Sequence, residues 1–111
     1  MTESQSNARV VLTTAGSVDE ARRIGRTLVE ERLAACATIV SSVESIYRWE
    51  GEIESSTEAL LLLKTTAEQI EPLQARLHEL HSYQTPEFLV LPVESGSDGY
   101  IEWLHASLRK S

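Results

Sequence analysis

The sequence has little of what several large protein classes require. Its 111 residues contain one cysteine, Cys36, which can neither close a disulfide within the chain nor supply a thiolate cluster alone. No stretch reaches the roughly 20 apolar residues of a membrane span. Only 10 Lys and Arg stand against 17 Asp and Glu, a net charge of −7, whereas nucleic acids and anionic membranes bind clustered cations. We therefore expect neither as a partner, and the single free cysteine predicts a cytoplasmic protein.

Motifs of common enzyme classes are missing as well. The chain has no GxxxxGK[ST] phosphate loop, no GxGxxG dinucleotide fingerprint and no GxSxG nucleophile elbow. It also lacks the aromatic and basic strand pattern of RNA-recognition domains. A nucleophile built on Cys36 would be a remaining route to catalysis, with only one thiol to support it. The sequence thus predicts a protein that is not an enzyme.

Unbroken apolar runs are present at residues 10–12, 59–63 and 88–91. Side chains alternate between the two faces of a strand, so such a run makes a strand that is apolar on both faces. These strands need cover above and below. The helical periodicity of the chain supplies only about three helices for that purpose. We therefore expect one sheet face to contact another copy of the protein.

Local signals predict the order β-α-β-β-α-β, followed by a helix near the C-terminus. Capping boxes at Ser17–Glu20 and Thr66–Gln69 predict two helix starts, and the first helix should run to about Leu33. Glu50–Gly51 is the strongest turn signal, and Ser41–Ser42 predicts a bulge in the strand before it. The strands are expected at 9–14, 35–40 continuing into 43–49, 52–66 and 87–93, and the last helix from 98.

This order is the ferredoxin-like arrangement of the α+β class. Both main helices then cover one sheet face and leave the other open. The two arms beside the turn, about 12 to 15 residues each at ~3.3 Å per residue, make a hairpin roughly 40 to 50 Å long that reaches past its own domain. Pro92 limits the last strand to a sheet edge or a bulge. Residues 1–8 are expected to form a disordered polar tail, and residues 9–111 a single domain.

Four segments resemble a known family: RLAACATIV (32–40), SIYRWEGEIE (45–54), LLLKTT (61–66) and HSYQTPEFLVLPV (81–93). In this order they are similar to the CutA divalent-cation-tolerance family, and the similarity extends over about residues 9–109. The resemblance implies a ferredoxin-like subunit in a tight homotrimer, whose long hairpins wrap the neighbouring copies. It also implies an architecture like that of the PII signalling proteins, a link with tolerance to divalent metals, copper especially, and no well-defined enzyme activity.

Copper or another divalent cation is the ligand that the resemblance implies, without being obligatory. Copper favours imidazole and thiolate ligands, which makes His81 and Cys36 the candidate metal ligands. Two positions depart from the family, because Thr13 stands where some members carry a cysteine and Leu80 where some carry a second histidine. The structural alternatives are Cys36 as a small core residue and His81 as the cap of its helix.

Further motif residues are expected to line a cleft between subunits: Tyr47, Trp49, Lys64, Tyr83 and Glu87. A ligand in this cleft would make the protein a PII-like small-molecule sensor or scaffold, which is the alternative to a metal-tolerance role. Lys64 ends an apolar run, so a buried Lys64 is expected to pair with a carboxylate such as Glu87. An ion pair and aromatic packing at a subunit interface would explain the same residues without a ligand.

Overall fold

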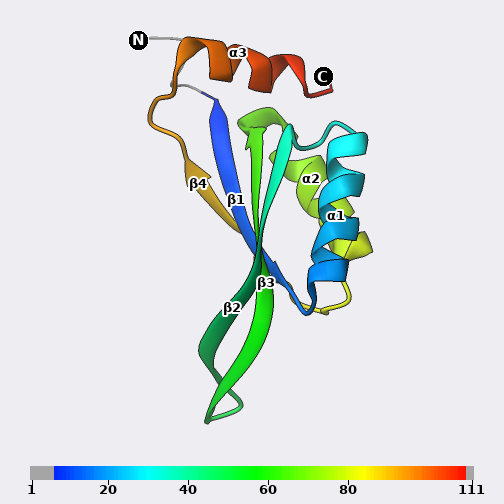
Figure 1. Cartoon of the computed structure of the whole chain (residues 1–111), viewed down its shortest axis with the longest axis vertical. Helices are drawn as coiled ribbons and strands as arrows, with labels where there is room; N and C mark the ends of the chain where they lie inside the picture. The colour runs from blue at the N-terminus through cyan, green and yellow to red at the C-terminus, as the bar shows by residue number, and fades with distance from the viewer. Residues whose placement is uncertain (1–6, 110–111) are drawn as a thin grey trace.

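The computed structural model describes residues 7–109 as a four-stranded antiparallel sheet with three α-helices (Figure 1). The elements are β1 (Ala8–Ala15), α1 (Val18–Glu30), β2 (Cys36–Trp49), β3 (Glu52–Thr66), a 3-10 turn η1 (Ala67–Gln69), α2 (Ile70–Leu80), β4 (Leu89–Pro92) and α3 (Asp98–Ala106). The strand order β2-β3-β1-β4 is the ferredoxin-like arrangement that the sequence predicts. None of these helices is both long and apolar enough to span a membrane.

The predicted disordered tail, residues 1–8, includes two residues that the structure places in the fold. The Asn7 carbonyl accepts a hydrogen bond from the Ala67 N–H at 2.8 Å, and the buried Ala8 opens β1. Both residues therefore belong to the folded domain, because Ala8 extends the pairing of β1 with β3 by one position. The rest of the predicted tail, residues 1–6, lies outside the described residues.

One sheet face packs against α1 and α2 and forms the main core. Val11, Leu61 and Leu63 point to this face from neighbouring strands and are fully buried. The Ser17 hydroxyl starts α1 as predicted, by accepting a hydrogen bond from the Glu20 N–H at 3.1 Å. The helices contribute fully buried side chains at helical spacing: Ala21, Ile24, Leu28, Leu73 and Leu77.

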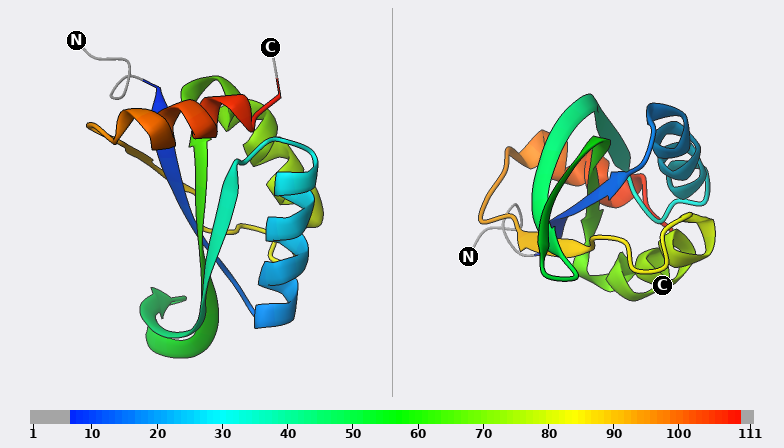
Figure 2. Two further views of the ribbon diagram at one scale, coloured as in Figure 1. Left: turned by 45° about the horizontal axis from the view of Figure 1, so that its top comes forward. Right: turned by 90° about the horizontal axis from the view of Figure 1, so that it is seen from below.

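The opposite sheet face, which we call the open face, is also apolar. Leu12 pairs with Leu62 on β3 and with Leu89 on β4. These residues alternate with the core residues along their strands, so their side chains point to the opposite face of the sheet. Helix α3 lies across one end of the sheet (Figures 1 and 2), where a second small core contains Ala8, Ala35, Ile101, Leu104 and Leu108. Away from α3 the open face remains accessible: Val40 is 42% exposed, Leu89 54% and Leu91 44%. The two-sided apolar strands that the sequence predicts are thus confirmed.

Strands β2 and β3 form a long hairpin that extends beyond the rest of the domain and curls (Figures 1 and 2). The register pairs Trp49 with Glu52, which leaves Glu50 and Gly51 as a two-residue turn with φ of 50° and 84°. Positive φ at both positions is typical of the turn that suits a twisted hairpin. The register shifts between Val40 and Val43, which confirms the predicted bulge.

Two predicted boundaries and one predicted cap differ from the structure. Helix α1 ends at Glu30 rather than Leu33, since Arg32 adopts a left-handed φ of 61°. The Thr66–Gln69 capping box does not form, because the Gln69 amide instead donates to the Arg109 carbonyl at 2.8 Å. Strand β4 covers only residues 89–92, since it pairs with β1 only from residue 9 to residue 12.

Candidate functional site

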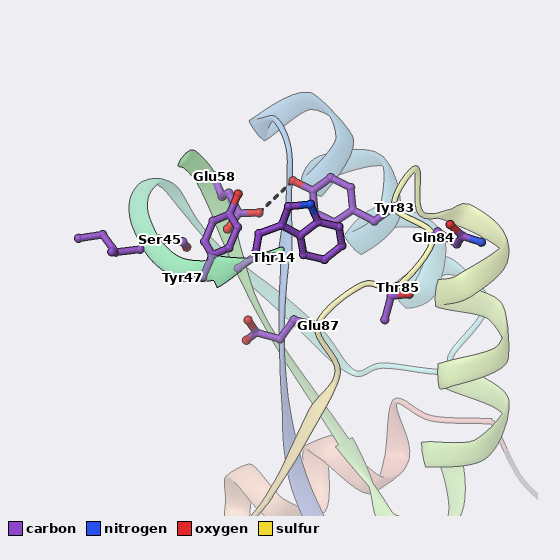
Figure 3. A pocket seen from close by; sticks show the side chains of 10 residues that line it. Thr14, Ser45, Tyr47, Glu58, Tyr83, Gln84, Thr85 and Glu87 are labelled. Carbon is purple, nitrogen blue, oxygen red and sulfur yellow. Dashed lines mark hydrogen bonds between the residues drawn. The ribbon is translucent and has the colours of Figure 1, made fainter. Parts of the chain in front are cut away.

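A cavity of about 760 Å³ lies between the curled hairpin and the loop that joins α2 to β4 (Figure 3). Its lining residues come from the end of β1, the two hairpin strands and this loop: Thr14, Ser45, Ile46, Tyr47, Trp49, Glu58, Tyr83, Gln84, Thr85 and Glu87. Of the residues that the sequence assigns to a ligand cleft, the structure brings together Tyr47, Trp49, Tyr83 and Glu87.

The hairpin supplies its side of the cavity through strand alternation. Ser45, Tyr47 and Trp49 are alternate residues of β2 and therefore share one face of the strand. Glu58 pairs with Val43 across the hairpin, so it joins that face from β3. The sequence analysis missed Glu58, although counting back from the Glu50–Gly51 turn would have placed it there.

Tyr83 and Glu58 connect the two sides of the cavity. The Tyr83 hydroxyl donates a hydrogen bond to Glu58 Oε2 at 2.9 Å (Figure 3). Burial, together with the hydrogen bond and the negative charge of Glu58, raises the pKa of Tyr83 to about 12. The phenol is therefore a neutral hydrogen-bond donor at physiological pH.

The lining of the cavity is acidic and aromatic. Glu58 and Glu87 contribute two carboxylates, and no Lys, Arg or His is among the lining residues. Within residues 7–109, the Glu87 carboxylate has neither a hydrogen bond nor an ion pair. The three aromatic residues are incompletely covered, with Tyr47 42% exposed, Trp49 61% and Tyr83 37%. The cavity therefore offers negative charge and open aromatic surface, and no positive charge for an anionic ligand.

His81 lies behind this cavity and holds the loop in place. Its Nε2 donates to the Thr14 carbonyl at 2.7 Å, and its Nδ1 accepts a hydrogen bond from the Tyr83 N–H at 3.0 Å. This pair of bonds defines the neutral tautomer with the proton on Nε2. The ring also contacts Tyr83, with ring centroids 4.7 Å apart. A metal ion at Nδ1 would have to displace the Tyr83 N–H.

Glu20 supports the same loop from α1. Its Oε2 accepts a hydrogen bond from the Ser82 N–H at 2.8 Å and lies 3.6 Å from His81 Nδ1. Partial burial raises the pKa of Glu20, but the hydrogen bonds from Ser82 lower it more, so the pKa lies below its ordinary value. Ionised Glu20 therefore stabilises the start of the loop.

Cys36 and Lys64 occupy a different region from the cavity. They are cross-strand partners in the β2–β3 pair, and Lys64 Nζ lies 2.8 Å from Thr38 Oγ1 and 3.7 Å from Cys36 Sγ. The expected ion pair between Lys64 and Glu87 is not among the contacts of residues 7–109. The structure thus separates the two candidate metal ligands and places Lys64 beside Cys36, because the strand register sets both positions.

Metal ligands do not gather within one chain. Among residues 7–109, no three His, Cys, Asp or Glu side chains come together in a way that could hold a metal ion. Two candidate ligands, the His81 imidazole and the Glu20 carboxylate, are adjacent. A site with three such ligands would need a second copy of the chain or residues outside this range.

Comparison with known proteins gives a consistent family assignment. Residues 9–107 match the family model described as CutA1 divalent ion tolerance protein. The divalent-cation tolerance protein CutA of Thermus thermophilus is 48% identical over 95 residues, which cover 86% of this chain and 92% of that protein. The chloroplastic protein CutA of Arabidopsis thaliana is 41% identical over 100 residues, which cover 90% of this chain. The chain spans about half of that plant relative, 55% of its length.

The fold has counterparts among solved structures. The crystal structure of CutA1 from Oryza sativa superimposes with a TM-score of 0.93 at 34% sequence identity. The superposition covers 98% of this chain and 100% of the rice chain. The arrangement of strands and helices described above is therefore shared over almost the whole chain.

Proposed function

The chain belongs to the CutA1 divalent ion tolerance protein family, and on this premise we propose that it acts in tolerance to divalent metals, copper among them, as a non-enzymatic homotrimer of the cytoplasm. The family match carries the metal-tolerance part of this proposal. The open face carries the assembly part. The choice of a trimer follows from the resemblance, and the cytoplasmic location follows from the free cysteine.

The open face supports self-association because its apolar side chains have too little cover within one subunit. Leu89 and Leu91 are about half exposed, and they continue the apolar surface of β1 and β3. Apolar area removed from water stabilises an interface by roughly 25 cal/mol per Å², and contiguous patches of this kind mark interaction sites. Strands β2 and β4 are also the two edges of the sheet, where backbone groups are free to pair.

For the metal, we propose His81 as the first ligand to test and Cys36 as a second, separate candidate. The proximity of His81 Nδ1 to the Glu20 carboxylate, 3.6 Å, supports His81 because imidazole and carboxylate are both metal ligands. Cys36 would offer a sulfur ligand beside the Lys64 side chain. Because the two residues lie apart, their contributions can be measured separately.

Isothermal titration of the assembled protein with Cu²⁺ tests this proposal. We expect wild-type protein to bind copper and His81→Asn to bind it at least about tenfold more weakly. His105→Asn is the matched control, since His105 is an exposed histidine of α3, and its affinity should stay within about twofold of wild type. Equal affinities for wild type and His81→Asn would exclude His81 as a ligand, and the same comparison with Cys36→Ser applies to the thiolate.

A second candidate function is that of a PII-like small-molecule sensor or scaffold. The cavity favours it, because a volume of about 760 Å³ lies within the roughly 300–1,000 Å³ of typical ligand sites. Four of the five residues that the sequence assigns to a ligand cleft line it. A thermal-shift screen of nucleotides, amines and other metabolites tests this function; a ligand whose shift is lost in Trp49→Leu supports it, and a screen without any shift contradicts it.

A further inference from the structure

The cavity beside the hairpin combines aromatic surface with carboxylates on two sides. Tyr47 and Trp49 approach from β2 and Tyr83 from the loop after α2. Figure 3 shows Tyr47, Glu58, Tyr83 and Glu87 around one space. Electron-rich ring faces and fixed negative charge attract the same kind of ligand, a positively charged group with a large, weakly hydrated surface.

We propose that this cavity binds an organic cation, a small molecule with a quaternary ammonium group. This inference rests on the second candidate function, that the cavity holds a small molecule, and it names the chemical class. The ammonium group lies against the aromatic rings, and Glu87 supplies the counter-charge.

The two carboxylates of the cavity differ in whether they already have a hydrogen-bond partner. Glu58 already accepts the Tyr83 hydroxyl on Oε2, and this bond fixes the position of both side chains. Glu87 has no hydrogen-bond or ion-pair partner within residues 7–109. A cationic ligand would give Glu87 the partner that the subunit does not provide.

Anions and metal ions fit this cavity less well than an organic cation does. The lining contains no Lys, Arg or His that would neutralise a phosphate or a carboxylate. A bare divalent ion needs several strong ligands close together, and no three His, Cys, Asp or Glu side chains come together among residues 7–109. Aromatic rings contribute little to an ion that keeps its water shell, whereas they stabilise an ammonium group directly.

Three probes of nearly one shape and different charge test the inference. They are choline, its neutral carbon analogue 3,3-dimethyl-1-butanol, and the anionic 3,3-dimethylbutanoate. Binding to the full-length protein is followed by ligand-observed NMR and calorimetry. We expect choline to bind at least about tenfold more tightly than the neutral alcohol, and the anion to show no binding.

Glu87→Gln should reduce the preference for choline over the neutral alcohol to within about twofold, because it removes the counter-charge and keeps the shape. Glu94→Gln is the matched control, since Glu94 is exposed and does not line the cavity, and its preference should equal that of wild type. Trp49→Leu should weaken choline about fivefold or more through the lost ring face. Circular dichroism and mass confirm that each variant is folded and assembled as wild type.

The possible results distinguish failure of the organic-cation inference from failure of the small-molecule function on which it rests. If the neutral alcohol or the anion binds as tightly as choline and Trp49→Leu weakens it, the organic-cation inference is overturned while the small-molecule function stands. If folded wild type binds none of the three probes, the inference is overturned, and a nucleotide or metabolite found in the thermal-shift screen would still support the small-molecule function. An unchanged preference in Glu87→Gln also overturns the inference, because the charge would then play no part.

Discussion

At the scale of single residues, His81 determines where the loop beside the cavity lies. Its two ring nitrogens bond the Thr14 carbonyl and the Tyr83 N–H, which ties the end of β1 to the first residues after α2. His81 is also the C-cap residue of α2, where its N–H donates to the Leu77 carbonyl, and its ring is buried. Because Tyr83 in turn bonds Glu58, one chain of contacts runs from β1 through the loop to the hairpin.

Glu20 gives this network a pH dependence. Its carboxylate has a pKa below the ordinary value of 4.5 in the folded protein, because the hydrogen bonds from Ser82 outweigh the effect of partial burial. A carboxyl group with a lowered pKa stabilises the fold above its unfolded pKa, and this contribution is lost as the pH falls through the folded pKa. We expect Glu20→Gln to lower the free energy of unfolding by about 1 kcal/mol at pH 7.

The difference between wild type and Glu20→Gln should shrink as the pH falls below about 4.5 and vanish in stronger acid. Urea unfolding at a series of pH values measures it. Asp19→Asn serves as the control, since Asp19 is in the same helical turn and is 92% exposed in its side chain. We expect less than about 0.5 kcal/mol for this variant; a constant difference for Glu20→Gln from pH 7 to pH 3 would contradict the role given to its charge.

At the scale of elements, the sequence predicts what local chemistry decides. The Ser17 cap, the Glu50–Gly51 turn and the bulge after Val40 depend on neighbouring residues, and the structure confirms all three. The Gln69 cap fails because a carbonyl 40 positions away, that of Arg109, takes its amide.

The candidate site shows the same limit of sequence-based prediction. Tyr47 and Trp49 could be grouped in advance because they share a strand face. Their meeting with Tyr83 and Glu87 depends on how the hairpin curls over a loop that is distant in sequence. The separation of Cys36 from His81 likewise follows from strand register and sheet order, which neither residue type reveals.

The close contact between α1 and β2 at Gly25 predicts that a side chain at this position would destabilise the fold. A Cβ atom at Gly25 would lie 2.9 Å from the Ala37 Cβ, closer than such atoms approach one another. Alanine is the better helix former by about 1 kcal/mol, but the clash would force the helix away from the sheet. We therefore expect Gly25→Ala to lower the free energy of unfolding by about 1–3 kcal/mol.

Gly99→Ala is the control for helix propensity without a clash. Gly99 lies in α3, and a Cβ there would have no heavy atom within 4 Å. Chemical denaturation should therefore find this variant as stable as wild type or more stable, by up to about 1 kcal/mol. Equal effects of the two substitutions would show that close packing of α1 on β2 is not what requires glycine at position 25.

At the scale of the whole molecule, the two faces of the sheet are both apolar and only one has helices along its length. In the proposed homotrimer, neighbouring copies cover these open faces. Leu62 lies at the centre of this surface, between Leu12 on β1 and Thr38 on β2. We expect Leu62→Glu to break the assembly, because a carboxylate at a buried interface without a partner costs at least about 2 kcal/mol per subunit.

Gln74→Glu introduces the same residue on the exposed side of α2, in the layer away from the open face. Size-exclusion chromatography with light scattering should show Gln74→Glu with the mass of wild type and Leu62→Glu at a lower mass. A Leu62→Glu variant that keeps both the mass and the thermal stability of wild type would show that residue 62 does not face a neighbouring copy.

Sedimentation equilibrium of the wild-type protein at micromolar concentration shows whether the open face is covered by further copies of the chain. We expect a single species of about 37 kDa, three times the 12.4 kDa of the chain. A folded species of 12.4 kDa that persists across the concentration range would contradict it, because the open face would then be stable in water without another copy.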